Sequence, residues 1–246
     1  MSVNAAAQRR LRATYQTSPV VYRIMRWIIG GLMRILYRYE VSGQENLPPR
    51  GPMILAVNHL HLFDPGAVMP AVPHKIVTLA ADKYKEHRII GGLLRAAGVI
   101  FVRRGEVDRQ ALQACLDVLR RGWVLAVAPE GTRSKTGGLQ RAKPGVAYLA
   151  LRTNAVIVPI AFWGIERIGD WKRLKRPSCH VVIGRPFRLP QPPGRATTDQ
   201  LQALADAIMV RIGLMLPPSY RGVYAARIAA VEAGQGDEPA LLPANP

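Results

Sequence analysis

The chain has 246 residues, and its 34 Lys and Arg against 16 Asp and Glu give a formal net charge of +18. Because 49% of the residues are apolar, the composition excludes a wholly disordered basic chain and allows one sizeable α/β domain with an appendage. Two cysteines are too few for a disulfide framework, which fits a reducing compartment. The charge predicts a polyanionic partner, and nucleic acid, acidic lipid and a phosphorylated substrate all qualify.

The first predicted element is an amphipathic helix over residues 18–38. Ser18 is a suitable N-cap, and Pro19 is a favoured first helical residue. At about 100° per residue, the apolar side chains fall on one side and the arginines occupy an opposite face about 120° wide. These arginines are Arg23, Arg26, Arg34 and Arg38.

Such a helix can lie in a membrane interface, with its apolar side down and its arginines reaching lipid phosphates. Packing of the apolar side on the protein core is the alternative, and a polar face whose only charged residues are arginines favours the membrane. Residues 27–33, the most apolar stretch, are too few to span a bilayer, which needs about 20 residues, and no signal-peptide cleavage site follows. We therefore expect residues 1–42 to be a membrane-associating region.

Short apolar runs alternate with helix-like stretches from residue 43 onward. The runs typical of buried strands are residues 53–57, 76–80, 99–102, 124–128 and 156–160. This alternation predicts an α/β fold with a mixed, largely parallel sheet covered by helices. We assign this domain to residues 43–224 and expect residues 225–246, which lack a core-forming pattern, to be a flexible tail.

Two polar clusters directly follow predicted strands, where open α/β sheets bind ligands. Residues 58–65 (Asn-His-Leu-His-Leu-Phe-Asp-Pro) follow one strand, and residues 129–134 (Pro-Glu-Gly-Thr-Arg-Ser) follow another. An ordinary helix start at Asp64 and an ordinary polar turn are the alternative interpretations. A strand–turn–helix passage would let Asp64 reach back to His59, which fixes the imidazole tautomer and makes the other ring nitrogen a better base. That base could activate the hydroxyl nucleophile of a substrate.

The Asn-His-x4-Asp of residues 58–64, together with the Pro-Glu-Gly-Thr-Arg of residues 129–133, resembles the glycerolipid acyltransferase family, typified by 1-acylglycerol-3-phosphate acyltransferase. Two further blocks look like the family's second and fourth motifs: Gly-Val-Ile-Phe-Val-Arg-Arg-Gly at residues 98–105 and Val-Ile-Val-Pro-Ile at residues 156–160. One departure from the family pattern is Arg103, which stands where relatives often carry Asp.

The resemblance implies transfer of a fatty acyl group from acyl-CoA or acyl carrier protein to a hydroxyl of a lysophospholipid. The default acceptor is 1-acylglycerol-3-phosphate, which would give phosphatidic acid, and other lipid acceptors can react by the same mechanism. His59 would be the general base that takes the proton of the acceptor hydroxyl, and Asp64 would orient His59 and stabilise the imidazolium, with no covalent acyl-enzyme. No metal or organic cofactor is expected, because the thioester is already activated.

The second and third motifs of the family bind the acceptor, which assigns this role to Arg104, Glu130, Gly131, Thr132 and Arg133. The guanidinium groups of Arg104 and Arg133 suit phosphate oxygens. Lys143, ahead of a predicted helix, could supply a further point charge, and a solvated loop lysine is an equally good interpretation.

The expected partners are an anionic membrane surface, the lysophospholipid and the acyl donor, at a peripheral or monotopic site on the cytoplasmic face of the cell membrane. Two alternatives belong to other classes. A metallohydrolase could use His59-x-His61 with Asp64, but the usual His-x-His-x-Asp-His order is not matched. A nucleic-acid-binding protein would use the charge, but no base-stacking motif is visible, so we expect no nucleic acid.

Overall fold

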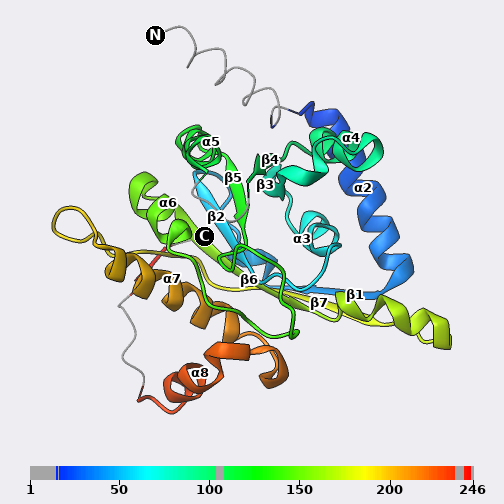
Figure 1. The fold of residues 1–246 in the computed structure, drawn as a ribbon. Coiled ribbons are helices and arrows are strands. Elements are labelled where there is room, and N and C mark those ends of the chain that lie inside the picture. Colours follow the sequence, from blue (N-terminus) through cyan, green and yellow to red (C-terminus); the bar gives the residue numbers. More distant parts are fainter. Residues whose placement is uncertain (1–14, 16, 104–107, 236–240, 245–246) are drawn as a thin grey trace, which may run out of the picture.

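The computed structural model describes residues 15, 17–103, 108–235 and 241–244. Within these residues, one nine-stranded sheet is covered by helices (Figure 1). The strands are β1 (Arg38–Ser42), β2 (Met53–Val57), β3 (Ile76–Ala81), β4 (Ile100–Val102), β5 (Val124–Val127), β6 (Val156–Trp163), β7 (Ser178–Ile183), β8 (Phe187–Arg188) and β9 (Leu242–Pro243). The α-helices are α2 (Pro19–Leu36), α3 (Asp64–Ala71), α4 (Arg88–Ala97), α5 (Arg109–Arg120), α6 (Gly145–Thr153), α7 (Thr198–Gly213) and α8 (Ala225–Glu232).

The main path of the sheet has the order β1-β7-β6-β2-β5-β3-β4. All neighbours from β6 to β4 are parallel, whereas β7 runs antiparallel to β6. The predicted α/β fold with a mixed, largely parallel sheet is thus confirmed. The central strand β2 has Ile54 and Leu55 fully buried on its two faces, which explains why its sequence is a continuous apolar run.

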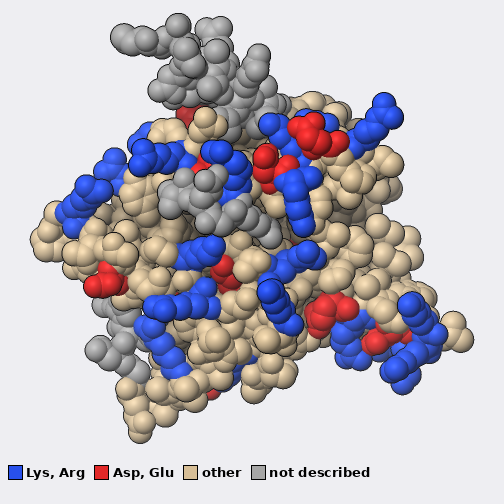
Figure 2. Space-filling view, viewed as in Figure 1, with Lys and Arg blue, Asp and Glu red and all other residues tan. Residues whose placement is uncertain are grey.

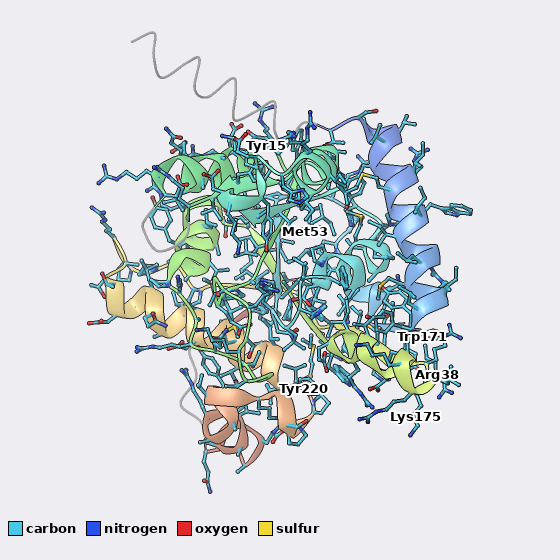
Figure 3. All side chains as sticks on the ribbon, turned by 45° about the vertical axis from the view of Figure 1, so that its right-hand side comes forward. Tyr15, Arg38, Met53, Trp171, Lys175 and Tyr220 are labelled. Atoms are coloured by element: carbon cyan, nitrogen blue, oxygen red, sulfur yellow. The ribbon has the colours of Figure 1, made fainter. Side chains whose placement is uncertain are left out.

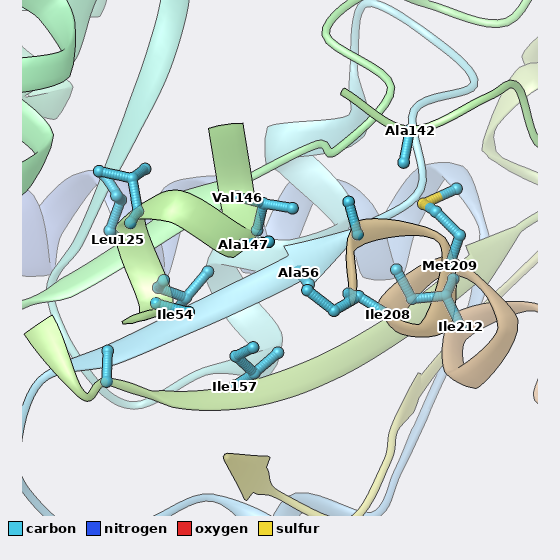
Figure 4. Packing of buried hydrophobic residues seen from close by; sticks show 14 of the residues in the cluster. Ile54, Ala56, Leu125, Ala142, Val146, Ala147, Ile157, Ile208, Met209 and Ile212 are labelled. Atoms are coloured by element: carbon cyan, nitrogen blue, oxygen red, sulfur yellow. The ribbon is translucent and has the colours of Figure 1, made fainter. Parts of the chain in front are cut away.

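Alternate residues of the central strands face two separate cores. On one face, Ile54, Leu125 and Ile157 pack with residues of α6 and α7 (Figure 4). On the other face, Leu55 and Val158 pack with residues of α2 and α3. Both faces of the sheet are covered in this way. The polar segments that follow β2 and β5 therefore lie at the edge formed by the carboxyl ends of these strands.

The N-terminal helix α2 begins at Pro19, as predicted, although the Ser18 side chain makes no capping hydrogen bond. It ends at Leu36, so that Arg38 lies in β1 and not on the predicted basic face of the helix. Figure 3 shows Arg38 and Trp171 near the end of α2, where the Trp171 indole N–H donates to the Leu36 carbonyl oxygen at 2.8 Å. No helix among the described residues has the length and apolarity needed to cross a membrane.

The side of α2 that packs on the domain carries Tyr22 and Met33, which are buried, and Arg26. The Arg26 guanidinium donates to the carbonyl oxygens of Met69 and Pro70 in α3, at 3.3 Å each, so one predicted lipid-facing arginine is used within the protein. The opposite side of α2 is apolar and exposed, so the alternative of core packing holds only for the edge of the apolar side, where Ile29 and Leu36 pack against the core. Its exposed residues are Val20, Val21, Ile24, Trp27, Ile28, Leu32 and Ile35.

The ordered core continues beyond residue 224, which corrects the predicted end of the domain and the predicted flexible tail over residues 225–232. Helix α8 occupies this stretch, and its Ile228 is fully buried in the core cluster that includes α7. Gly213 of α7 permits the contact, because a Cβ there would lie 2.2 Å from Ile228 Cδ1. A short, Ala-rich helix with one buried side chain carries little periodic signal, so the pattern did not indicate it.

Candidate active site

The two polar clusters lie side by side, because β2 and β5 are parallel neighbours and the clusters follow their carboxyl ends. The main chain joins them directly: the Ser134 N–H donates to the His59 carbonyl oxygen at 2.8 Å. Asn58 ties the first cluster to β6, since its side chain exchanges two hydrogen bonds with the main chain of Phe162, at 2.8 and 2.9 Å. Both clusters are therefore held on the sheet by long-range contacts.

The predicted contact between His59 and Asp64 is present. Asp64 is buried at the start of α3, and its Oδ2 lies 2.5 Å from His59 Nδ1. The same carboxylate accepts main-chain N–H groups of Leu60 and His61, at 2.8 Å each, so it also shapes the turn. The N-cap position of α3 is Phe63, so Asp64 is not the helix cap that the alternative interpretation expected, although its carboxylate does accept main-chain donors of the turn before the helix.

These bonds set the proton positions at the site. An ionised carboxylate only accepts hydrogen bonds, so His59 Nδ1–H is the donor and Nε2 is the basic nitrogen of the ring. Burial raises the pKa of Asp64, while its hydrogen bond to His59 and those from the main chain act in the opposite direction. The His59 side chain is 19% exposed, so the imidazole can be reached from solvent.

Glu130 bridges the His59 main chain and a later loop. Its carboxylate is buried, with Oε1 accepting the His59 N–H and Oε2 accepting the Gln140 N–H, each at 2.9 Å. The pKa of Glu130 is raised to about 7, because the effect of burial outweighs the hydrogen bonds, which act in the opposite direction. The sequence predicted an acceptor-binding role for this residue, whereas the observed bonds show a carboxylate whose two oxygens are engaged by the main chain.

The remaining predicted binding residues surround this bridge. Gly131 has φ +69°, and a Cβ there would lie 3.0 Å from Lys143 Cδ, so the lysine side chain passes over the glycine. The Thr132 carbonyl oxygen accepts from the Gln140 amide at 3.3 Å, and Arg133 is half-buried. The structure therefore brings Lys143 to the third motif. Arg104 lies outside the described residues.

Residues 138–142, here called the strap, support the site and were not identified from the sequence. Its Leu139 exchanges hydrogen bonds with the main chain of Tyr220 (2.9 Å) and Val223 (3.0 Å). Two glycines permit this approach, since a Cβ on Gly138 would lie 2.7 Å from Gly222 Cα. Close packing of two glycines far apart in the chain leaves no local signal.

The Tyr224 hydroxyl fastens the other end of the strap. It accepts the Ala142 N–H at 2.9 Å and donates to Asp206 Oδ1 at 2.5 Å. The Gln202 amide donates to the Ala142 carbonyl oxygen and to the same Asp206 oxygen, at 3.0 Å each. Residues of α7 and the segment after it are thereby linked through the strap to Glu130 and the His59 main chain.

Among the residues that the structure describes, no group of three or more His, Cys, Asp and Glu side chains is arranged to hold a metal ion. The His61 ring, which the metallohydrolase alternative would require, lies against Phe63 with the ring centroids 5.1 Å apart.

These features define an α/β protein with a buried aspartate in contact with a histidine beside a glycine-containing loop, at the carboxyl ends of parallel strands. The Acyltransferase family model matches residues 38–163, just over half of the chain, and the chain belongs to this family. The resemblance inferred from the motifs is thus confirmed.

Individual relatives share this family. The chain is 30% identical over 189 residues to 1-acyl-sn-glycerol-3-phosphate acyltransferase alpha of Homo sapiens, which covers 72% of this chain and 64% of that protein. It is 30% identical over 143 residues to 1-acyl-sn-glycerol-3-phosphate acyltransferase of Borreliella burgdorferi, covering 57% of this chain and 55% of the relative. The chain thus spans less than two thirds of either relative.

A solved structure shows the same fold. The crystal structure of the 1-acyl-sn-glycerophosphate acyltransferase PlsC from Thermotoga maritima superposes with a TM-score of 0.59 over 76% of each chain, at 20% sequence identity.

Proposed function

We propose that the protein is an O-acyltransferase that moves a fatty acyl group from an acyl thioester, acyl-CoA or acyl carrier protein, to a hydroxyl of a lysophospholipid. The most direct acceptor is 1-acylglycerol-3-phosphate, and the product is then phosphatidic acid. The observation that carries the proposal is the His59–Asp64 contact next to the Glu-Gly-Thr-Arg loop. The names of the relatives, which are 1-acyl-sn-glycerol-3-phosphate acyltransferases, support the acceptor.

In the proposed reaction, His59 Nε2 takes the proton of the acceptor hydroxyl while the oxygen attacks the thioester carbonyl carbon. The tetrahedral intermediate then collapses, the carbon–sulfur bond breaks, and the thiolate receives the proton from the imidazolium. Asp64 holds Nδ1–H and stabilises the imidazolium through the 2.5 Å contact. The acceptor itself is the nucleophile, so no acyl-enzyme forms. In support of this, Cys115 and Cys179 are buried, and burial raises the pKa of each to about 12.

The acceptor phosphate is assigned to the basic side chains of the second and third motifs. Arg133 and Lys143 carry cations beside the Glu-Gly-Thr-Arg loop, and Arg104 is assigned the same role by its place in the second motif. Gly131 and Thr132 form the loop that the acceptor contacts. Glu130 contributes by holding the His59 main chain. No metal or organic cofactor takes part, because the thioester supplies the activated acyl group.

The same proposal places the protein at an anionic membrane surface, peripheral or monotopic on the cytoplasmic face. Support comes from the exposed apolar side of α2, on which the Trp27 side chain is 83% exposed. Large exposed apolar patches on a soluble domain mark interaction surfaces. Basic side chains also dominate the charged groups on the face seen in Figure 2, as an acidic lipid surface requires. No nucleic acid is part of the proposal.

The test measures thiol release from acyl-CoA with a panel of lysophospholipid and other lipid acceptors. H59A should lose turnover by about 100-fold or more with an unchanged fold, because general-base catalysis contributes a factor of this size. H61A is the matched control, since it removes the other histidine of the same loop. Turnover that survives H59A would refute the proposal, and turnover abolished by EDTA would favour the metallohydrolase.

A further inference from the structure

Helix α6 and the start of α7 lie beside the loop of residues 189–197 (Figure 1), and these three segments line a cavity of about 1050 Å³. Small-molecule sites in proteins have volumes of about 300–1,000 Å³, so the cavity has room for an organic ligand. Among the described residues, none that the proposed active site uses contributes to its lining. The cavity is therefore a feature that the active site does not account for.

Two arginines of the lining have no anionic partner within the described part of the chain. Arg152 lies in the last turn of α6, and Arg195 lies in the loop before α7. Neither guanidinium forms an ion pair or a hydrogen bond among the described residues, and none of the described lining residues is acidic. A helix C-terminus favours a cation such as Arg152, but this explanation does not apply to Arg195. Two guanidinium groups at one cavity suit the oxygens of phosphate groups.

The uncharged part of the lining suits a planar ring. Tyr148 is its aromatic residue, and Leu151 and Leu201 supply aliphatic walls. Nucleic-acid bases stack on aromatic side chains because every base has a π-face. The Gln191 amide N–H donates to the Leu151 carbonyl oxygen at 3.5 Å, which leaves the amide oxygen to accept a hydrogen bond from an amino group such as that of adenine. Phosphates at the arginines and a base at Tyr148 together make a nucleotide.

We propose that this cavity binds an adenine nucleotide, with its phosphates on Arg152 and Arg195 and its base against Tyr148. The nucleotide end of CoA has this chemistry, since it carries phosphates at the 3′ and 5′ positions of one adenosine. The cavity then holds the nucleotide end of an acyl-CoA donor, and a free nucleotide is the other source of the same groups. The assignment to the donor rests on the proposed acyltransferase function, whereas binding of the nucleotide does not.

The cavity adjoins the segment that carries the proposed acceptor site. Tyr148 lies one helical turn, about 5 Å, after the start of α6. Lys143 precedes that start by two residues and passes over Gly131 of the Glu-Gly-Thr-Arg loop. On α7, Gln202 directly follows a lining residue, and its amide donates to the Ala142 carbonyl oxygen at 3.0 Å. The pantetheine arm of CoA, which joins the nucleotide to the thioester, can therefore run along the start of α6 toward the active site.

Isothermal titration calorimetry of the full chain tests nucleotide binding without any assay of activity. The ligands are CoA, adenosine 3′,5′-bisphosphate, ATP and inorganic phosphate. The double variant R152A/R195A should bind CoA and adenosine 3′,5′-bisphosphate about 100-fold more weakly than the unaltered protein, because two charge-assisted contacts are lost. R173A is the matched control, since it removes an exposed arginine outside the cavity and should leave these affinities unchanged. Equal affinity in the double variant overturns the proposal, as does an unaltered protein that binds no nucleotide or binds inorganic phosphate as tightly.

Kinetics of acyl transfer decide whether the bound nucleotide is part of the donor. R152A/R195A should raise the KM for acyl-CoA by about 100-fold at unchanged kcat, as expected from the weaker binding. With an acyl-pantetheine thioester, which lacks the nucleotide, both constants should match those of the unaltered protein. If the variant transfers normally from acyl-CoA although it no longer binds ATP, the cavity serves a free nucleotide and the assignment to the donor is wrong. An equal loss on both thioesters would mean that the arginines support the active site itself, which also overturns that assignment. An unaltered protein without acyl transfer would refute the proposed function, while calorimetry would still decide nucleotide binding.

Discussion

Replacement of Glu130 by glutamine tests the buried carboxylate that joins the two motifs. In the folded chain, its two oxygens accept the main-chain N–H groups of His59 and Gln140. An amide offers only one oxygen, so E130Q leaves one of these donors facing an NH2 group. A protonated carboxyl has the same defect, because one oxygen then carries a hydrogen. The free energy of unfolding of the variant should therefore be close to that of the unaltered protein at low pH, where Glu130 is protonated. The two values should differ at high pH, where Glu130 is ionised.

The size of the difference follows from the pKa of Glu130, which burial raises from 4.5 to about 7. Between these values, the folded chain keeps a proton that the unfolded chain has released, so this residue lowers the free energy of unfolding as the pH rises. Each unit of pKa is worth about 1.4 kcal/mol, which gives about 2 to 3 kcal/mol between pH 5 and pH 8. The glutamine does not titrate. The free energy of unfolding of E130Q relative to the unaltered protein should therefore rise by that amount over this interval.

Urea unfolding of both proteins at pH 5 and pH 8 measures this change, since other titrating groups cancel in the difference between the two proteins. E45Q, which alters an exposed glutamate, controls for the substitution itself. A difference between E130Q and the unaltered protein that is the same at both pH values would refute the reasoning. It would show that the carboxylate is ionised in the folded chain throughout this range, at no cost from burial.

Three further predictions concern the proposed base, the strap and the membrane surface. D64N should lower kcat by about 10³-fold or more in the thiol-release assay, because an NH2 group facing Nδ1 imposes the wrong tautomer on His59. Normal turnover would contradict the roles assigned to His59 and Asp64. Y224F leaves the Ala142 N–H and the Asp206 carboxylate without the hydroxyl that both bind. The free energy of unfolding measured in urea should therefore fall by about 1–3 kcal/mol, and turnover should fall with it. Unchanged turnover would show that the strap does not support the site. Serine at three exposed apolar positions of α2 should weaken binding to anionic vesicles by about 100-fold in flotation at unchanged stability, and equal binding would remove α2 from the membrane surface. These positions are Ile24, Trp27 and Leu32.

The sequence by itself determines the elements whose signal is local. The continuous apolar run of residues 53–57 indicates a strand buried on both faces, and it is the centre of the sheet. The contact of His59 with Asp64 is predictable because both lie in one short turn, where five residues set the geometry. The two faces of α2 are likewise visible as periodicity in the sequence.

Only the tertiary structure decides which partners these elements meet. Periodicity shows that α2 has an apolar side, but the packing of Arg26 and Met33 on α3 is what leaves that side exposed. The bond from the His59 main chain to Glu130 and the bond from the Ala142 main chain to Tyr224 join residues far apart in the chain, as does the burial of Ile228 in α8. Such contacts depend on the shapes of surfaces that exist only once the sheet has formed, and no local pattern encodes them.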